Sequence, residues 1–246
     1  MSWTRTPSDV SGLEPLAELR LLGSWQLRYG SAPLPVTIPA QRFLVLLALQ
    51  GRQRRSYVAG TLWPDVLDTV ALKRLRGVLW SLRRCCPRLI EARDGALALN
   101  EGVWVDVHEL VASATALLEH GARDPNRLLA HLAILANPGE VLVGWYDEWI
   151  TLERTRINEL RIRALEVLVE ALLFVGLHVQ ASRAATTAVE LDPLRESTHR
   201  ALMRVYLAEG NGALARRQVH RYREILRSEL GSGEPTEEML ALLAPS

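Results

Sequence analysis

The stretch Leu72–Cys86, LKRLRGVLWSLRRCC, determines how the first half of the chain is interpreted. At about 100° per residue, its apolar side chains fall within roughly a third of a helix circumference and its basic side chains fall on a separate arc. The apolar arc comprises Leu72, Leu75, Val78, Leu79 and Leu82, and the second arc comprises Lys73, Arg76, Gly77, Trp80, Arg83 and Arg84. The pattern predicts a helix over 69–85 whose leucines face a core.

Trp80 falls in the middle of the basic arc and not among the leucines. Basic side chains neutralise phosphates, and arginine also pairs with guanine edges in bidentate fashion. Glycine is a poor helix former, so Gly77 on this face indicates a point where a missing side chain lets DNA approach closely. The alternative is that Trp80 covers apolar surface of a second domain. We expect DNA contacts from Lys73, Arg74, Arg76, Gly77, Trp80, Arg83 and Arg84.

The charge of the chain is divided unevenly along its length. Residues 39–100 contain 11 Lys and Arg against 4 Asp and Glu, a net charge of 11 − 4 = +7. Residues 101–246 contain 15 arginines against 21 acids, a net charge of 15 − 21 = −6. This asymmetry favours a polyanionic partner for the first half, and the alternative is uneven drift on two solvated surfaces.

Short elements precede the basic helix. Residues 1–18 show no periodicity and are expected to form a flexible arm. Alternation over 19–38 predicts short antiparallel strands with a turn near 30–33. Helical periodicity predicts helices over 39–50 and 56–63, the second with Ser56 as its N-cap and Pro64 as its stop.

After the basic helix, the pair Asp94–Gly95 stands between two apolar stretches and predicts a hairpin. Strands, three helices and a hairpin, in that order, are typical of a winged helix-turn-helix over 19–105, in which the third helix enters the major groove. We expect further DNA contacts from Arg54 and Arg55, in the polar break before the second helix, and from Arg93 beside the hairpin turn.

Residues 106–246 are almost entirely helical in pattern and are expected to form a second domain. Positions 168, 172, 176, 181 and 188 are matched 34 residues later by 202, 206, 210, 215 and 222. A period of about 34 with small residues at helix crossings is typical of tetratricopeptide-type helix pairs. The alternative is two unrelated amphipathic hairpins. The predicted fold is therefore mainly α with a small β component (α+β).

Signatures of enzymes are missing from the sequence. It contains no phosphate-binding P-loop, no G-x-S-x-G elbow and no H-E-x-x-H motif. Its six histidines lack ligand spacing, and its two adjacent cysteines, Cys85 and Cys86, cannot form a structural disulfide framework. Neither a secretory signal nor an apolar run long enough to span a bilayer is present. We expect no catalysis, no cofactor, no metal, no membrane association and a cytoplasmic location.

Several motifs of the chain are similar to those of two known bacterial domains. PAQRFLVLLAL (39–49), LWPD (62–65) and LKRLRGVLWSLRR (72–84) are similar to the OmpR-type winged helix. VDVHEL (105–110), the segments 144–166 and 188–211, and SELGSGEPTEEMLALL (228–243) are similar to the bacterial transcriptional activator domain. Together these motifs resemble the SARP family of actinobacterial pathway activators over about residues 19–243, and the chain looks like a small, stand-alone member.

The resemblance implies a homodimeric activator that binds direct repeats in promoter DNA and recruits RNA polymerase through its sigma or alpha subunit. It implies control of a biosynthetic gene cluster. In OmpR-type domains the loop between the second and third helices can touch polymerase, and here that loop comprises Pro64, Asp65, Val66, Leu67, Asp68 and Thr69. The hairpin departs from the family pattern, because it reads DGALALN and lacks a Gly–Tyr–Arg element. Two other functions stay open: a helical-repeat adaptor that binds peptides through 164–228, and a repressor on the same scaffold.

Overall fold

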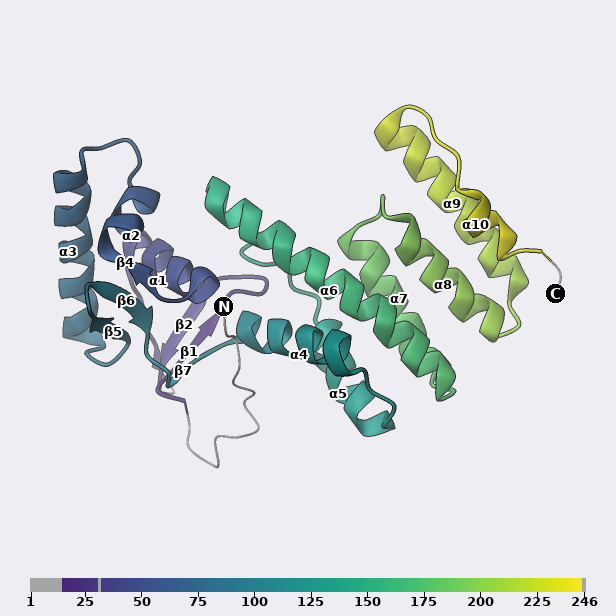
Figure 1. Cartoon of the computed structure of the whole chain (residues 1–246), viewed down its shortest axis with the longest axis horizontal. Helices are drawn as coiled ribbons and strands as arrows, with labels where there is room; N and C mark the ends of the chain where they lie inside the picture. The colour runs from purple at the N-terminus through teal and green to yellow at the C-terminus, as the bar shows by residue number, and fades with distance from the viewer. Residues whose placement is uncertain (1–14, 31, 245–246) are drawn as a thin grey trace. The chain divides into compact units, whose positions relative to one another are not determined.

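The computed structural model describes residues 15–30 and 32–244 (Figure 1). These residues divide into two compact units. The first contains the described residues up to Glu109 and also Gly139–Thr155, and the second contains Leu110–Pro138 and the chain from Arg156 onward. The arm expected over 1–18 lies mostly outside the described residues, and its last two residues, Ala17 and Glu18, belong to the first strand.

A four-stranded sheet belongs to the first unit. Its strands are β1 (Ala17–Arg20), β2 (Gln26–Tyr29), β3 (Ala32–Pro33) and β7 (Val103–Val105), in the order β3-β2-β1-β7. β1 pairs antiparallel with β2, as the alternation predicts, and parallel with β7, which the sequence did not predict. Ala17 and Leu19 are fully buried, so every second residue of β1 contributes to the core.

The helices α1 (Ile38–Gln50), α2 (Arg55–Leu62) and α3 (Asp68–Cys85) each begin one residue before the predicted start. α1 is the core helix of this unit, because its residues from Phe43 to Leu49 are all buried. The predicted N-cap of α2 was wrong: Arg54, without a side-chain cap, occupies that position in place of Ser56. Gln53–Arg54, predicted as a plain break, form strand β4, because their backbone pairs with the later hairpin.

The predicted hairpin is present as β5 (Ile90–Arg93) and β6 (Ala96–Leu99), and we refer to it as the wing. Its turn residues Asp94 and Gly95 have φ values of 53° and 74°. Two positive φ values at the centre of a two-residue turn match the right-handed twist of the flanking strands. Together with β4, the wing forms a three-stranded sheet in the order β4-β6-β5.

The segment Gly139–Thr155, expected in the second domain, packs on the end of β1. Val141 forms a bridge with Leu22, and the Leu142 N–H donates to the Leu21 carbonyl oxygen over 2.8 Å. A Cβ on Gly139 would lie 2.9 Å from backbone atoms of Leu22 and Gly23, so only glycine fits this approach. These contacts lie beyond any local sequence pattern, and the boundary near residue 105 stays a prediction.

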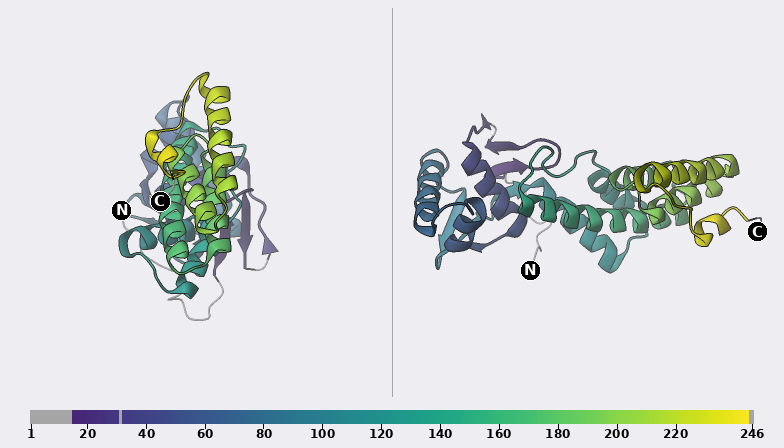
Figure 2. Two further views of the ribbon diagram at one scale, coloured as in Figure 1. Left: turned by 90° about the vertical axis from the view of Figure 1, so that its right-hand side faces the viewer. Right: turned by 90° about the horizontal axis from the view of Figure 1, so that it is seen from above.

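The remaining helices are α4 (Asp106–His120), α5 (Pro125–Leu135), α6 (Glu148–Phe174), α7 (His178–Leu191), α8 (Glu196–Ala208), α9 (Gly212–Leu230) and α10 (Glu237–Ala241). α7, α8 and α9 pack successively side by side (Figures 1 and 2). Arg161 of α6 is buried in the second unit, and its Nε donates to the Leu135 carbonyl oxygen over 2.8 Å. Its guanidinium therefore satisfies carbonyl groups at the end of α5.

The 34-residue repeat is visible in the backbone of the second unit. Gly176 and Gly210 have φ values of 77° and 72°, and each terminates a helix. The hydrogen bond from Leu177 N to Leu172 O (2.9 Å) has its counterpart from Asn211 N to Tyr206 O (2.7 Å). Glycine is favoured at both positions because a left-handed residue with a Cβ is strained. The two helix pairs therefore share their turn geometry as well as their sequence period.

Candidate nucleic-acid interface

The two arcs predicted for α3 are the two faces of the helix in the structure. Leu75, Val78, Leu79 and Leu82 are buried, and Ala71 joins them. Lys73, Arg74, Arg76, Arg83 and Arg84 are all exposed. Trp80 is 63% exposed, in the centre of the basic side chains. We call Lys73, Arg76, Trp80, Arg83 and Arg84 the basic face of α3.

The cations of α3 have no acidic partners in the described parts of the chain. No ion pair among residues 15–30 and 32–244 involves Lys73, Arg74, Arg76, Arg83 or Arg84. The sequence explains this, because no acid stands between Asp68 and Glu91. In contrast, α8 and α9 hold Arg204 against Glu170 and Arg227 against Glu234. The positive charge of α3 is therefore available to an external anion.

Trp80 and Arg84, one helical turn apart, lie in contact. The guanidinium carbon of Arg84 is 4.7 Å from the centroid of the Trp80 ring. A cation above an indole face is attracted by the negative face of the ring, so Trp80 restricts where the guanidinium can point. The sequence placed both residues on one face but gave no indication of this stacking.

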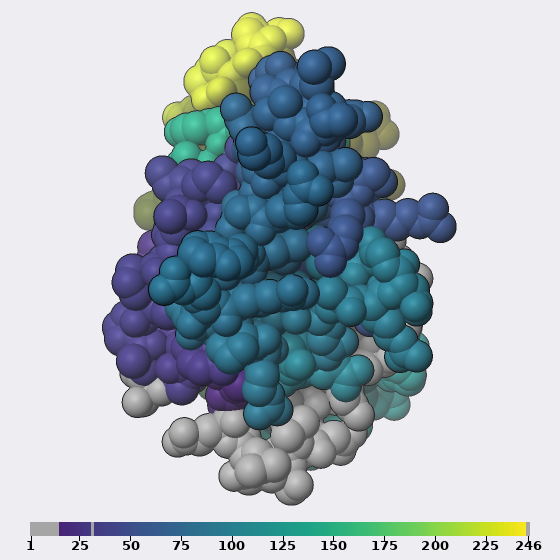
Figure 3. All heavy atoms as spheres, turned by 90° about the vertical axis from the view of Figure 1, so that its left-hand side faces the viewer, coloured from purple at the N-terminus to yellow at the C-terminus, as the bar shows by residue number. Residues whose placement is uncertain are grey.

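The other predicted DNA contacts lie together at the wing. Arg54, the last residue of β4, is exposed and pairs with Ala96 of β6. Arg93 of β5 pairs with the same Ala96 from the opposite side. The Arg55 backbone N–H donates to the Gly95 carbonyl oxygen over 3.2 Å, which joins the start of α2 to the wing turn. The first unit thus brings Arg54, Arg55 and Arg93 together as a second basic group. Figure 3 shows the face on which α3 (blue) and the wing (blue-green) are exposed beside each other.

The loop predicted to contact polymerase is shorter than expected. α3 begins at Asp68, so Asp68 and Thr69 lie in its first turn and not in the loop. The helix starts at Asp68 because a carboxylate in the first turn is stabilised by the positive N-terminal end of the helix. Pro64, Asp65, Val66 and Leu67 form the connection, and Leu67 is 76% exposed. Val70, in the first turn of α3, is 40% exposed.

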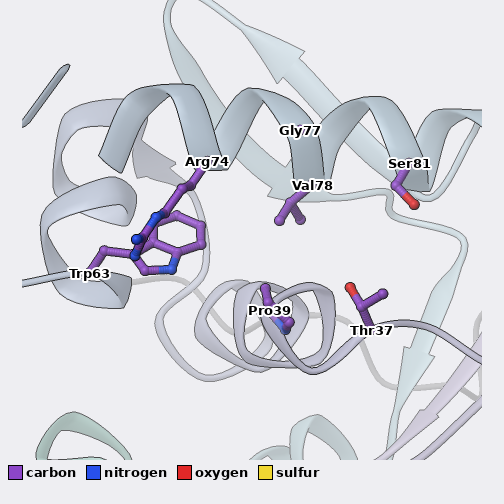
Figure 4. A pocket seen from close by; sticks show the side chains of 7 residues that line it. All are labelled: Thr37, Pro39, Trp63, Arg74, Gly77, Val78 and Ser81. Atoms are coloured by element: carbon purple, nitrogen blue, oxygen red, sulfur yellow. The ribbon is translucent and has the colours of Figure 1, made fainter. Parts of the chain in front are cut away.

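A groove of about 450 Å³ runs along one flank of α3 (Figure 4). We call it the flank groove. Arg74, Gly77 and Ser81 line it from α3, Thr37 lines it from the start of α1, and Trp63 from the end of α2. Arg74 and Gly77 are among the residues that the sequence predicts as DNA contacts, whereas it assigned no role to Thr37, Trp63 and Ser81. Only the spacing 74–77–81 could have indicated that these α3 residues share one flank.

Reactive groups are sparse in the structure. Among the described residues, no cluster of three or more His, Cys, Asp or Glu side chains could hold a metal ion. Burial raises the pKa of the Cys86 thiol to about 12, so this thiol stays protonated and is a poor nucleophile. None of the helices in the described ranges is both long and apolar enough to cross a membrane.

Comparisons with known proteins agree with this architecture. Residues 105–244 match the family described as the bacterial transcriptional activator domain. Regulatory protein AfsR of Streptomyces griseus is 29% identical over 247 residues, which cover 97% of this chain and 25% of the relative. Regulatory protein AfsR of Streptomyces coelicolor is 30% identical over 203 residues, covering 78% of this chain and 20% of the relative. The chain thus spans about a quarter or less of the length of these relatives.

A solved structure has the same fold across nearly the whole chain. Mycobacterium tuberculosis EmbR, in complex with a low-affinity phosphopeptide, matches 94% of this chain and 64% of its own, with a TM-score of 0.72 and 20% sequence identity. At that identity the likeness concerns the fold alone. It agrees with the predicted combination of a winged helix-turn-helix and a helical domain.

Proposed function

This chain belongs to the SARP family of transcriptional regulators, and on that premise we propose that it binds promoter DNA sequence-specifically through α3 and activates transcription. The observation that carries the proposal is the basic face of α3, exposed and without acidic partners in the described structure. Arginine and lysine on such a helix neutralise phosphates and read guanine edges in the major groove. The wing group, Arg54, Arg55 and Arg93, supplies additional backbone contacts.

The first test removes two basic side chains from the predicted reading face. The double substitution Arg76→Ala and Arg84→Ala is expected to abolish footprints on promoters next to the chain's own gene. Both side chains are exposed, so the thermal unfolding midpoint should change little. The matched control, Arg216→Ala with Arg217→Ala on exposed positions of α9, should leave the footprint intact. A footprint that survives the α3 double change assigns DNA reading to another surface.

The sites on DNA are expected to be direct repeats one helical turn apart, bound by a homodimer. Activation is assigned to the loop Pro64–Leu67 with Asp68 and Thr69, which would contact the sigma or alpha subunit of RNA polymerase. Its exposed Asp65 and Leu67 offer an acidic and an apolar contact side by side. We propose action in the cytoplasm, on nucleoid DNA, at a biosynthetic gene cluster. In transcription assays with purified polymerase, an activator should increase the amount of transcript, and Asp65→Ala should reduce that increase. A repressor should instead lower the amount of transcript.

A second candidate function is a peptide-binding adaptor. A groove of about 220 Å³ in the helical repeat is lined by Glu166, Glu170, Ser197, Arg200 and Arg204. These side chains already pair with their neighbours, as Arg204 does with Glu170 over 2.9 Å, so a peptide would have to displace existing ion pairs. Salt dependence separates the two functions, because log affinity for DNA falls by about 0.9 per phosphate contact for each unit of log salt. A flat salt profile on duplex DNA favours the adaptor.

A further inference from the structure

The segment 139–155 belongs to the first unit, although it lies in the part of the chain that matches the bacterial transcriptional activator domain. Arg154 holds the turn in this segment, because its Nε donates to the Val141 carbonyl oxygen over 2.8 Å. Its Nη2 donates to the carbonyl oxygens of Leu142 and Trp145 over 2.7 and 2.9 Å. One side chain thus orients three backbone carbonyl groups, and the residues that follow them are fixed in place.

Asp147 follows this turn and forms an ion pair with Arg42 of α1. The side chains of Asp147 and Arg42 are only 23% and 26% exposed, so solvent and salt screen their attraction less than that of a surface pair. Nη1 of the same guanidinium donates to the Leu62 carbonyl oxygen over 3.1 Å. Nε of Arg42 is buried and has no hydrogen-bond partner in the described parts of the chain, so the contacts of the two Nη groups orient the guanidinium.

The Leu62 carbonyl group lies at the end of α2. Leu62 is the last residue of this helix, so its carbonyl oxygen is among those that lack a partner within the helix. The hydrogen bond from Arg42 supplies that partner. The chain then continues through Trp63 into the connection Pro64–Leu67, which joins α2 to α3 (Figure 1). The ion pair of Arg42 with Asp147 therefore fixes the point at which this connection leaves α2.

We propose that Arg42 and Asp147 are positioning residues for activation, which hold the connection Pro64–Leu67 in the conformation that RNA polymerase binds. A loop that is fixed before binding loses less entropy on binding than a mobile one does. Neither side chain belongs to the basic face of α3, so the two residues are expected to affect activation and not DNA affinity. The proposal rests on the proposed function, because it assumes that the connection contacts polymerase, and it adds two residues outside that contact.

The first test removes the carboxylate that holds Arg42. With purified polymerase and enough protein to saturate the promoter, Asp147→Ala should reduce the increase in transcript about three- to tenfold, because the connection must then be ordered on binding. The dissociation constant of the variant for the promoter duplex should equal that of wild type. The matched control is Glu18→Ala, which removes the ion pair of Glu18 with Arg20 (3.5 Å) in β1 and should leave both measurements unchanged.

A second variant keeps the positive charge and changes its geometry. Arg42→Lys retains a cation beside Asp147, but one ammonium replaces the two Nη groups that contact the carboxylate and the Leu62 carbonyl oxygen. We expect a similar loss of transcript, with a smaller change in the thermal unfolding midpoint than in Asp147→Ala, which leaves a half-buried guanidinium without its carboxylate. Circular dichroism melting curves give these midpoints and define the assay temperature at which each full-length variant is folded.

A double-mutant cycle with Asp65→Ala separates positioning from a merely structural role. Asp65 belongs to the connection and is proposed to contact polymerase directly. If Asp147 acts through the connection, Asp147→Ala should reduce the transcript little further in the Asp65→Ala background. A general loss of stability would instead reduce the transcript by the same factor in both backgrounds.

The outcomes separate this inference from the proposed function. If wild type does not increase the transcript, or if Asp65→Ala leaves the increase intact, the proposed role of the connection fails and the inference fails with it. If wild type activates through Asp65 and either Asp147→Ala or Arg42→Lys activates as fully as wild type, the inference alone is overturned. It is also overturned if Asp147→Ala lowers DNA affinity and transcript by equal factors, or if its effect is the same with and without Asp65.

Discussion

At the scale of single residues, the contact of Trp80 with Arg84 gives the exposed indole a role. The ring is 63% exposed and lies 4.7 Å from the guanidinium carbon, so its face holds the cation in place at the end of α3. An arginine whose direction is already restricted loses less entropy when it pairs with a base or phosphate. We therefore expect Trp80 to act through Arg84.

Replacing the ring tests this role. Trp80→Leu is expected to lower DNA affinity about two- to fivefold, since an exposed cation–π contact contributes about 0.5–1 kcal/mol. In a double-mutant cycle, Trp80→Leu should have little further effect once Arg84 is alanine. Trp80→Phe, which keeps an aromatic face, is the control and should retain most of the affinity. Equal losses from Trp80→Leu with and without Arg84 would mean that the indole contacts DNA by itself.

Two glycines with open space at the Cβ are predicted to respond oppositely to alanine. Gly77 lies within α3, so Gly77→Ala should raise the free energy of unfolding by about 1 kcal/mol, the difference in helix propensity. Gly176 has a φ of 77°, so Gly176→Ala should lower it by about 1–2 kcal/mol, because a Cβ is strained in the left-handed region. Urea denaturation measures both. A loss of stability in Gly77→Ala would show that a side chain there meets an obstacle.

At the scale of elements, the sequence predicted those whose pattern is local and periodic. α3 and α1 begin within one residue of expectation, and the 34-residue repeat recurs in matched turns at Gly176 and Gly210. The pairing of β7 with β1 and the packing of 139–155 on the end of β1 were not predicted, because both partners lie more than eighty residues away. The basic face followed from helical period alone. The flank groove did not, because Thr37 and Trp63 come from other elements.

The short helix α10 covers the exposed end of the helical repeat. Met239 is fully buried in a cluster with Met203, Val219 and Tyr222. A terminal repeat has no following pair to bury its apolar face, so an element of this kind completes the core. The next residue, Leu240, is 40% exposed.

The adjacent residues provide a matched pair of substitutions. Met239→Ala is expected to lower the free energy of unfolding by about 2–5 kcal/mol, through lost burial and the cavity that remains. Leu240→Ala, on the exposed side of the same helix, should change it by about 0.5 kcal/mol or less. Thermal and urea denaturation followed by circular dichroism provide both values. Similar small effects of the two changes would mean that α10 does not contribute to the core.

At the scale of the whole molecule, the distribution of charge affects binding, and histidines with a lowered pKa affect stability. The cations of α3 lack acidic partners in the described residues, whereas arginines of the helical repeat pair with Glu170 and Glu234. Burial also lowers the pKa of His108, His131 and His199 below the usual 6.5. The charge distribution bears on binding, and the histidines bear on stability.

His199 is held as a neutral ring. Its Nε2 lies 2.9 Å from the Pro193 carbonyl oxygen, so Nε2 carries the proton, and its Nδ1 accepts from Gln218 Nε2 over 2.7 Å. Burial is the main cause of its low pKa; Arg221 lowers the pKa further, while Glu196 and Asp192 oppose the shift. A second proton on Nδ1 would face the Gln218 amide. The folded state therefore binds this proton less readily than the unfolded chain does.

Acid is consequently expected to destabilise the protein. The contribution of His199 is fully present above about pH 6.5 and is lost as the pH falls below it, with a slope of at most about 1.4 kcal/mol per pH unit for one proton. The contributions of Asp106 and Glu109 to the pH dependence of stability have the opposite sign, because burial raises the pKa of each carboxyl.

Urea denaturation between pH 7.5 and 5.5 should show a shallower loss of stability in His199→Gln than in wild type, and comparison of the two proteins cancels the contributions of the two carboxyl groups. His220→Gln, at an exposed position of α9, should follow the wild-type profile. Parallel profiles for wild type and His199→Gln would show that the buried ring does not titrate on unfolding.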